Sequence, residues 1–523
     1  MKLYDFNQRK DASSPEGFIE KFLEHVANSP DNVAMEMIPS GQTFTYSQLL
    51  EMSERIKSNL VGMGVGSGDR IVVMLPSSAE FIASVLAITS LGSMAIFVGN
   101  NVTDFELQPR LDDSKPSGAI VVSDTLSKPL LKCDTLRFAL TLAEPSCDNA
   151  GRGIKIRGLK GTKLNRITLT PPSGNPGTGC HFTYKGFGYP LGAVHRYNDY
   201  SWSLDGYKTT FKDVTNRNHL MALPMYPIYG LVTSLFALTI GAKLIVVTDI
   251  KNVDIYNVIS QKKVGYLGLV PVMIENLMVE GDYYKKLGKD PKKDFVEGMC
   301  LVSGGSFLDK TILQKFENIF GCVPYQGFGS SETLPILASD FKHNLLGSVG
   351  IPMNDEFDVS IVDINGNQLE DGAIGQVAIN SPTLSKEYIN RPFETKSICR
   401  GNRMLTGDLG YKNADGYLFF VGRHMRFTKI AAQMTDLVEI ENVFNAHPLV
   451  ERSISTVRRS EKNSEYVYTE ISVRPGSNIS KTELVEHCRR FIAPHKIPRG
   501  INIIERKKRH YLSNPKTAWE GMQ

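Results

Sequence analysis

Strand and helix patterns alternate along the first part of the chain. Thr45 opens an amphipathic pattern that predicts a helix to about Gly62, and the apolar residues 70–75 predict a strand. The next segment has the hydroxyl and acidic residues of a helix start and predicts a helix that ends near Gly92, before a strand at residues 94–98. Repeated units of this kind are typical of a parallel sheet that helices cover.

The alternation returns later and then gives way to a different pattern. Residues 264–270 and 299–303 predict strands, each next to predicted helices. From about Leu345 the chain shows short strands and turns, at residues 359–363 and 375–379 for example, which favours a meander or barrel. A chain of 523 residues exceeds the size at which one core stops growing, so two or more domains are expected.

The charge balance gives no support for nucleic-acid binding. Lysine and arginine number 59, and aspartate and glutamate number 55, so no basic excess would attract a phosphate backbone. The seven cysteines contain no C-x-x-C pair, which is typical of reduced thiols in a cytoplasmic protein. The amino terminus shows no apolar segment of a secretion signal, so we expect a cytoplasmic location.

The longest uncharged stretch covers residues 219–242. Pro224, Pro227 and Gly230 interrupt its first half, and only residues 231–240 are continuously apolar. The whole stretch is long enough in principle to span a bilayer, but the interruptions leave only this short apolar segment. We therefore predict no membrane span, and instead a buried helix that leads to a strand at residues 243–248.

Two glycine-rich stretches follow predicted strands. One is Ser303-Gly304-Gly305, and the other is Gln326-Gly327-Phe328-Gly329-Ser330-Ser331-Glu332, which we expect to form a turn after a short strand at residues 322–325. Glycine allows a bound group to approach the backbone, and Phe328 offers a flat face. Ser331 can hydrogen-bond a phosphate oxygen and Glu332 can hold a divalent ion. A nucleotide site is one interpretation, and an ordinary loop is the other.

A third stretch, Thr406-Gly407-Asp408, precedes a predicted hairpin. Asp415-Gly416 is a typical hairpin turn, so Asp408 and Arg423 are expected on neighbouring strands or at their ends. A carboxylate here can bind two ribose hydroxyls, and the arginine can reach a sugar or a phosphate.

These stretches occur together, and in this order, in one known superfamily. With Gly422-Arg423 as the fourth piece, the chain resembles the adenylate-forming superfamily of acyl-CoA synthetases, nonribosomal-peptide adenylation domains and beetle luciferases. The resemblance covers nearly the whole chain. Supporting matches lie at residues 45–49, 64–70, 223–230, 439–441, 447–448 and 493–498.

The resemblance implies an α/β fold with two domains. Residues 1–422 would form a large N-terminal domain of two helix-covered sheets plus a distorted β-barrel, and residues 423–523 a small, mobile α+β C-terminal domain. In the family's reaction a carboxylate attacks the α-phosphate of ATP to give an acyl-adenylate, and a thiol then displaces AMP. The implied cofactors are ATP, Mg²⁺ and coenzyme A. The implied partners are a small carboxylic acid and coenzyme A or a carrier protein. A homodimer is a further alternative.

The resemblance also assigns roles by motif position. Phe328, between Gly327 and Gly329, would stack on adenine, while Ser331 would bind the α-phosphate and Glu332 would hold Mg²⁺. Asp408 would bind the ribose with the help of Arg423, and Lys516 would be the catalytic lysine. Residues expected to line the adenine and acyl pockets are Tyr226, Pro227, Tyr229, Gly230, Ser303, Gly304, Gly305 and Gly329.

Several positions depart from the family pattern. The family's phosphate loop is rich in Ser, Thr and Gly and ends in Pro-Lys-Gly. We expect its counterpart in residues 171–184, where a loop lysine is missing and Pro176 removes an amide donor, with Lys185 as one base that could substitute. The candidate phosphate-binding residues there are Ser173, Gly174, Gly177 and Thr178.

Further departures affect the thiol half-reaction and the acyl pocket. Met425 replaces a hinge residue that is usually charged. Lys429, assigned to cofactor binding, is followed by Ala431 and Ala432 where a second lysine and a glycine of the pantetheine tunnel are expected. Tyr226-Pro227 replaces an aromatic-histidine gate, which favours an apolar or aromatic acid.

Two hypotheses of different classes follow. The first is an AMP-forming carboxylate–CoA ligase, with transfer to a carrier-protein pantetheine as a variant. The second is a non-catalytic homologue that binds a nucleotide or acyl-adenylate and acts as a regulatory partner. Glu332 favours an enzyme, because a binding protein has less need of a metal-binding carboxylate.

Overall fold

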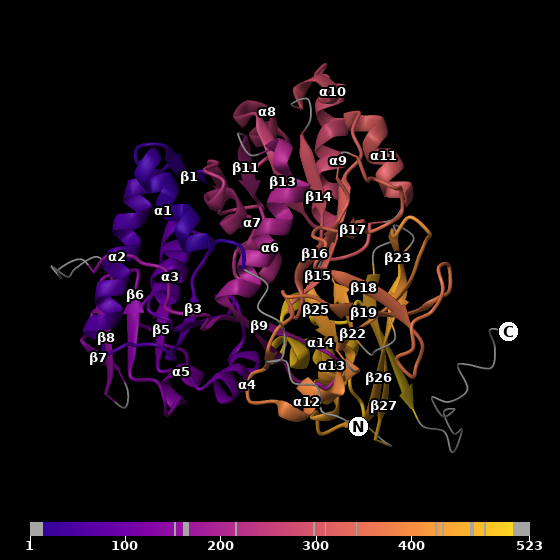
Figure 1. The fold of residues 1–523 in the computed structure, drawn as a ribbon. Coiled ribbons are helices and arrows are strands. Elements are labelled where there is room, and N and C mark those ends of the chain that lie inside the picture. The colour runs from indigo at the N-terminus through magenta and orange to yellow at the C-terminus, as the bar shows by residue number, and fades with distance from the viewer. Residues whose placement is uncertain are drawn as a thin grey trace.

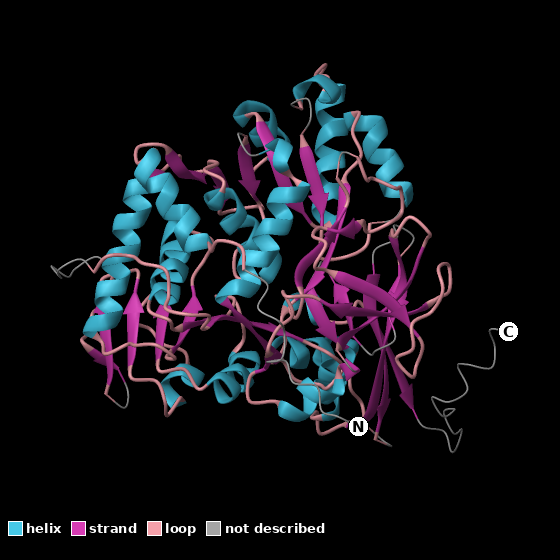
Figure 2. Ribbon diagram, viewed as in Figure 1, coloured by secondary structure: helices cyan, strands magenta, loops and turns pink. Residues whose placement is uncertain are grey.

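The structure is a computed structural model. It describes residues 14–150, 153–159, 167–214, 217–295, 299–308, 310–340, 342–400, 402–423, 427–430, 433–460, 465–474 and 477–505. These residues form two large mixed sheets, a smaller curled sheet and a separate carboxyl-terminal sheet, with helices packed on them (Figure 1, Figure 2). This arrangement confirms the predicted α/β fold class.

The first large sheet, sheet A, has the strand order β17-β16-β15-β14-β13-β11-β12-β1-β2. Its central strands are parallel, and antiparallel strands close both edges. Its strands are β1 (Val33–Ile38), β2 (Thr43–Thr45), β11 (Asn218–Met221), β12 (Leu244–Val247), β13 (Val264–Leu269), β14 (Cys300–Ser303), β15 (Tyr325–Ser330), β16 (Leu334–Ala338) and β17 (Ile351–Pro352).

The second large sheet, sheet B, has the order β20-β10-β9-β4-β3-β5-β6-β8-β7. It is also parallel at its centre, and β9 and β10 form an antiparallel hairpin. Its strands are β3 (Arg70–Met74), β4 (Met94–Phe97), β5 (Gly118–Val121), β6 (Phe138–Thr141), β7 (Asn149–Ala150), β8 (Ile154–Gly158), β9 (Gly177–Thr183), β10 (Leu191–Arg196) and β20 (Glu387–Tyr388).

The helices pack against both faces of these sheets. The helix predicted from Thr45 is α2, and the Thr45 side chain caps it in a capping box with Gln48. The helices are α1 (Phe18–Asn28), α2 (Tyr46–Gly62), α3 (Ala79–Ser90), α4 (Asp104–Ser114), α5 (Lys128–Lys132), α6 (Tyr197–Thr210), α7 (Ile228–Thr239), α8 (Ile255–Lys262), α9 (Pro271–Lys286), α10 (Pro291–Asp294), α11 (Lys310–Phe320), α12 (Pro392–Ser397), α13 (Leu437–Asn445) and α14 (Lys481–Arg489).

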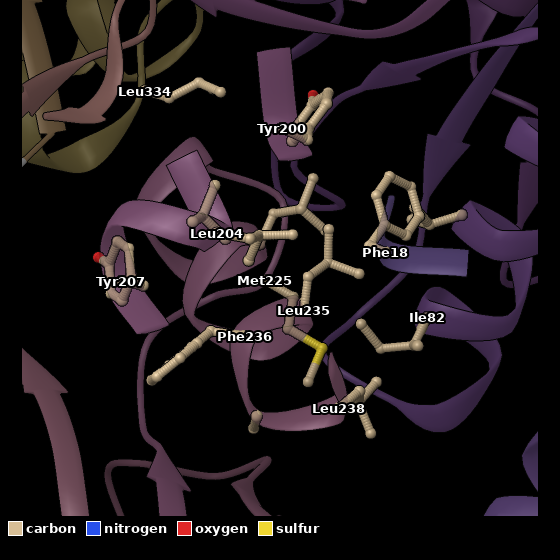
Figure 3. Close-up of a cluster of buried hydrophobic side chains, with 14 of the residues drawn as sticks. Phe18, Ile82, Tyr200, Leu204, Tyr207, Met225, Leu235, Phe236, Leu238 and Leu334 are labelled. Carbon is tan, nitrogen blue, oxygen red and sulfur yellow. The ribbon is translucent and has the colours of Figure 1, made fainter. Parts of the chain in front are cut away.

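The largest core lies between the two large sheets. Helices α1, α6 and α7 contribute buried side chains to it, among them Phe18, Tyr200 and Phe236 (Figure 3). The same cluster includes Ile71 of sheet B and Leu244 of sheet A, so it joins both layers. Because both faces of each sheet are covered, the central strands are apolar on both sides.

Helix α7 is the buried helix that the sequence predicted within residues 219–242. Residues 230–239 are buried, and β12 follows, close to the predicted strand. None of the helices in the described part of the chain is both long and apolar enough to cross a membrane.

The smaller sheet, sheet C, contains the predicted hairpin. Its strands are β18 (Asp358–Val362), β19 (Gly375–Asn380), β21 (Cys399–Arg400), β22 (Arg403–Lys412) and β23 (Leu418–Arg423). The turn at Gly416, with φ of 84°, joins β22 to β23. Asp408 and Arg423 are directly opposite in the register, which confirms their predicted placement on neighbouring strands.

The carboxyl-terminal part has a core of its own. Strands β24 (Phe427–Ile430) and β25 (Gln433–Asp436) form a hairpin, and β26 (Val450–Arg459), β27 (Glu465–Val473) and β28 (Gly500–Glu505) form a sheet. Ile440 and Phe444 of α13 and Leu484 of α14 pack on that sheet. The domain boundary at residues 422/423 stays a prediction.

One local prediction was wrong. The sequence predicted a turn over residues 326–332, whereas residues 325–330 form β15 itself and pair with β16. Glycine is needed at position 329 within the strand, because a Cβ there would lie 2.5 Å from the carbonyl oxygen of Leu334. Close approach of two backbones, rather than a turn, explains glycine at this position.

Candidate functional site

A cavity of about 280 Å³ lies where several strands of sheets A and B end. Residues at the carboxyl ends of β4, β9 and β14 line it, together with β15, the edge of sheet C and residues 493–496 of the carboxyl-terminal part. In open α/β sheets ligands bind beyond the carboxyl ends of the strands. The predicted site residues that line this cavity are Tyr226, Pro227, Tyr229, Gly304, Gly305, Gly327, Phe328, Gly329, Ser331, Glu332 and Asp408.

Strand β15 carries the central part of the site. Phe328 is half-buried and Gly327 and Gly329 flank it, so its ring face and the adjacent backbone are open to the cavity. Ser331 directly follows β15. Its carbonyl oxygen lies 2.7 Å from Nε2 of the buried His195, and this contact holds the backbone of Ser331 in place. This segment can hold a planar ring beside an anionic group.

Glu332 is buried and engaged by two neighbours. Its Oε1 accepts a hydrogen bond of 2.6 Å from the hydroxyl of Tyr388 and lies 3.2 Å from Lys185 Nζ. Burial alone would raise the pKa of Glu332, but the charge of Lys185 and these hydrogen bonds hold that pKa below its usual value. Glu332 is therefore an ionised carboxylate in a charge-balanced pair.

Mg²⁺ does not fit readily beside this pair. The described residues contain no group of three or more His, Cys, Asp and Glu side chains that could hold a metal ion. One Glu332 oxygen is committed to Lys185 and Tyr388, and Oε2 is buried with no hydrogen-bond partner among the described residues. A divalent ion on Oε2 would share the carboxylate with an ammonium group.

The hairpin of β22 and β23 positions Asp408. Its carboxylate is buried, with 6% of the residue exposed, and it faces the cavity. The backbone N–H of Asp408 donates to Thr406 Oγ1 at 3.0 Å, and that hydroxyl donates to the carbonyl oxygen of Val377. The left-handed backbone of Gly407, with φ of 82°, makes the bend between them. These contacts hold Asp408 where it can accept hydrogen bonds from a diol.

The rest of the cavity wall is mostly apolar. Its side chains include Phe211, Leu337, Val349 and Met353. Tyr229 donates its hydroxyl to the carbonyl oxygen of Val302 at 3.0 Å, so it presents mainly ring surface to the cavity. A wall of this kind suits an apolar or aromatic group.

Two residues that were predicted to line the pocket contribute to packing and not to the cavity wall. Ser303 and Gly230 are not among the described residues that line the cavity. A Cβ at Gly230 would lie 1.9 Å from the carbonyl oxygen of Pro224, so glycine permits the start of α7 to pack on that segment. Ser303 is buried at the end of β14.

The predicted phosphate-binding residues lie away from the cavity. Ser173, Gly174, Gly177 and Thr178 precede or begin β9, and none of them lines the cavity in the described part of the chain. The loop that does reach it is the β9–β10 connection, residues 184–190. This loop leads into Pro190-Leu191-Gly192 at the start of β10.

The residues predicted to bind phosphate therefore lie at the amino end of β9, whereas the cavity lies at the carboxyl end of this strand. Both ends of this strand are rich in glycine, so composition alone does not distinguish them. The prediction placed the loop after the apolar run at residues 167–170, which forms no strand in the structure. The rule that ligands bind at carboxyl ends of parallel strands, applied to β9 itself, selects the loop after Thr183. The sequence predicted Lys185 only as a base that could substitute for the loop lysine, and it did not indicate Tyr184 as a site residue.

The carboxyl-terminal part closes one side of the cavity with buried charges. Lys496 Nζ lies 2.6 Å from Glu106 Oε1 and 2.8 Å from Glu439 Oε2. Tyr184 donates to Glu439 at 2.6 Å and accepts from Lys496 at 3.1 Å. These contacts join α4 and the β9–β10 loop to α13 and residues 494–496.

The remaining predicted residues are described in part or not at all. Arg423 and Lys429 have defined backbone positions in β23 and β24. Lys516, Met425, Ala431 and Ala432 lie outside the described residues. Their predicted roles stay predictions.

The model of the AMP-binding enzyme family matches residues 22–389, which is more than half of the chain. The chain belongs to the AMP-binding enzyme family. A 2-succinylbenzoate–CoA ligase from Oceanobacillus iheyensis is 24% identical to it over 492 residues, which cover 92% of this chain and 94% of that protein. The predicted resemblance to adenylate-forming enzymes is thus confirmed at the level of the family.

Two solved structures of o-succinylbenzoate CoA synthetase from Bacillus subtilis share the fold of this chain. A double mutant bound to a product analogue superposes with a TM-score of 0.81 at 19% identity, covering 95% of this chain and 97% of that chain. The complex with an acyl-adenylate intermediate gives a TM-score of 0.67 at 19% identity, covering 95% and 96%.

Proposed function

We propose that this chain activates a carboxylic acid with ATP, releases pyrophosphate, and transfers the acyl group from the resulting adenylate to the thiol of coenzyme A. The observation that carries this proposal is the convergence of Phe328, Ser331 and Asp408 on one cavity with an apolar wall. These residues supply a stacking face, a phosphate ligand and a diol ligand. Membership of the AMP-binding enzyme family supports the same reaction class.

The residues suggest how the first half-reaction is arranged. The Asp408 carboxylate would accept hydrogen bonds from both ribose hydroxyls while Phe328 stacks on adenine. Ser331 would donate to an α-phosphate oxygen, which orients the phosphorus for attack by the substrate carboxylate. The carboxylate oxygen forms the new bond to phosphorus, and pyrophosphate leaves with the electron pair of the broken P–O bond.

In the second half-reaction a thiolate attacks the acyl carbon and AMP leaves. The apolar wall formed by Tyr229, Val349, Met353 and Leu337 supports an apolar or aromatic acyl group. Lys516, assigned by resemblance to the adenylation step, lies outside the described residues, and we propose that it contacts the forming adenylate.

The test is carboxylate-dependent exchange of labelled pyrophosphate into ATP, measured with a panel of aliphatic and aromatic acids. Exchange with at least one apolar acid is expected, followed by AMP release and thioester formation when coenzyme A is added. ATP binding without exchange for any acid would contradict the ligase and favour the nucleotide-binding regulator. Lys516→Ala is expected to suppress exchange and leave ATP binding nearly unchanged.

A further inference from the structure

The carboxylate that the family pattern assigns to Mg²⁺ already has a cation beside it. Lys185 Nζ lies 3.2 Å from Glu332 Oε1, and only 5% and 0% of the two side chains are exposed. The same ammonium donates to the carbonyl oxygen of Thr406 at 3.0 Å. Tyr388 donates a hydrogen bond to the same Oε1 atom of Glu332. Lys185 is thus held in place by groups of sheets A and C.

The position of Lys185 in the chain brings it next to the proposed phosphate site. It is the second residue after β9, in the connection to β10. It lines the same cavity as Ser331 and Asp408, between which a nucleotide phosphate would lie. A lysine ammonium is a compact charge that proteins use to bind phosphate.

Charge balance disfavours a second cation on this carboxylate. A divalent ion bound at about 2.1 Å to either oxygen of Glu332 would lie within about 7 Å of Lys185 Nζ. In a buried site with reduced dielectric, like charges at that distance repel each other appreciably. Oε2 of Glu332, which has no hydrogen-bond partner among the described residues, is the atom at which such an ion would have to bind.

We propose that Lys185 takes the place of the divalent cation at Glu332, so that this chain binds the nucleotide phosphates without Mg²⁺. The inference rests on the proposed function, because it concerns the same nucleotide site. Lys185 carries the positive charge toward the phosphates, and Glu332 and Tyr388 position it.

The first test compares ATP binding by the wild-type chain in excess EDTA and in excess Mg²⁺, measured by isothermal titration calorimetry. The two dissociation constants are expected to agree within about threefold. ATP affinity at least tenfold weaker in EDTA would overturn the inference and leave the proposed function standing. No ATP binding under either condition would overturn the proposed function and, with it, the inference.

The second test uses Lys185→Met. ATP affinity in EDTA is expected to fall at least tenfold, and added Mg²⁺ is expected to restore part of it, because Glu332 is then available to a metal ion. The control is Lys386→Met, an exposed lysine outside the cavity lining, which is expected to bind ATP like the wild type. Unchanged affinity of Lys185→Met in EDTA would overturn the inference.

Loss of Lys185 leaves a buried carboxylate without its cation, so the single variant could unfold. Lys185→Met combined with Glu332→Gln removes both charges and is expected to fold, as circular dichroism would show. Its ATP affinity is expected to be weak in EDTA and not restored by Mg²⁺. Restoration by Mg²⁺ would show a metal site independent of Glu332 and would overturn the inference.

A direct metal measurement needs no variant. The electron paramagnetic resonance signal of free Mn²⁺ is recorded with wild-type protein at saturating AMP. The free signal is expected to stay unchanged at micromolar Mn²⁺. Stoichiometric loss of that signal would overturn the inference.

Discussion

Lys496 and Glu106 form a buried ion pair across 390 residues of sequence, with Nζ and Oε1 2.6 Å apart. Lys496 belongs to the carboxyl-terminal part and Glu106 to α4, and each has 3% of its side chain exposed. Burial alone would lower the pKa of Lys496, but Tyr184, Glu439 and Glu106 hold it above its usual value. The ammonium is therefore charged and lies between two carboxylates at the contact between the two parts.

Lys496→Met should weaken this contact strongly. The change leaves Glu106 and Glu439 buried without their cation, which costs about 3–5 kcal/mol when one partner of a buried pair is lost. We expect a lower melting temperature and faster proteolytic cleavage between residues 423 and 450. Adding Glu106→Gln should recover part of the loss, because one unpaired charge disappears.

The control for this prediction is Lys481→Met, an exposed lysine on α14. It should melt and resist proteolysis like the wild type. If Lys496→Met also behaves like the wild type, the ion pair does not hold the two parts together.

Asp408→Ala should reduce AMP affinity by about ten- to a hundredfold. One or two hydrogen bonds to a charged group are worth about 1.5–3 kcal/mol in total, and each 1.4 kcal/mol is a factor of ten. Asp415→Ala is a matched control, since Asp415 is an exposed acid at the turn of the same hairpin. Calorimetric titration with AMP distinguishes them. Equal affinities for both variants would remove Asp408 from the nucleotide site.

The hairpin that carries Asp408 was predictable because its signal is local. Asp415-Gly416 determines the turn, and strand pairing then places Asp408 opposite Arg423. The alternating strands and helices were predictable for the same reason, since apolar periodicity acts over neighbouring residues. The cluster of Glu106, Tyr184, Glu439 and Lys496 has no such signal, because only the packing of distant elements brings these residues together.

The predicted phosphate loop shows a second kind of information that the sequence does not contain. Glycine-rich segments precede and follow β9, and composition does not say which end of a strand faces the ligand. The parallel pairing of β9 with β4 decides it, because their carboxyl ends meet at the cavity. The Lys185–Glu332 pair follows from this geometry and was not visible in the motif.

Gly329→Ala should destabilise the protein much more than Gly327→Ala. A Cβ at Gly329 would lie 2.5 Å from the carbonyl oxygen of Leu334 and 2.8 Å from Cα of Pro335, both backbone atoms that cannot move independently. A Cβ at Gly327 would meet its nearest atom at 3.5 Å, an ordinary contact. Overpacking of this kind costs about 1–3 kcal/mol, so the melting temperature of the Gly329 variant should fall by several degrees. Similar melting of both variants would show that β15 and β16 can separate at low cost.

His219 should make the protein sensitive to acid. Its ring is buried and stacks on Tyr266, with the ring centroids 4.8 Å apart. The Nε2 atom of His219 lies 3.2 Å from the carbonyl oxygen of Val214. Burial lowers the pKa of His219 to about 4. Because this folded-state pKa lies below the usual value near 6.5, the unfolded chain binds the proton first as the pH falls.

The stabilising contribution of neutral His219 is complete above pH 6.5 and is lost progressively as the pH falls toward 4, by up to about 3 kcal/mol. His219→Phe keeps a ring for stacking on Tyr266 and removes this dependence, at a pH-independent cost of about 1 kcal/mol for the lost hydrogen bond. The wild type should therefore melt at a higher temperature than the variant at pH 7, at a similar temperature near pH 5.5, and at a lower temperature at pH 4.5. His343→Phe, at a partly exposed histidine beside Asp340, is the matched control and should keep the wild-type slope. A His219→Phe protein that loses stability as steeply as the wild type would assign the acid sensitivity to other buried groups.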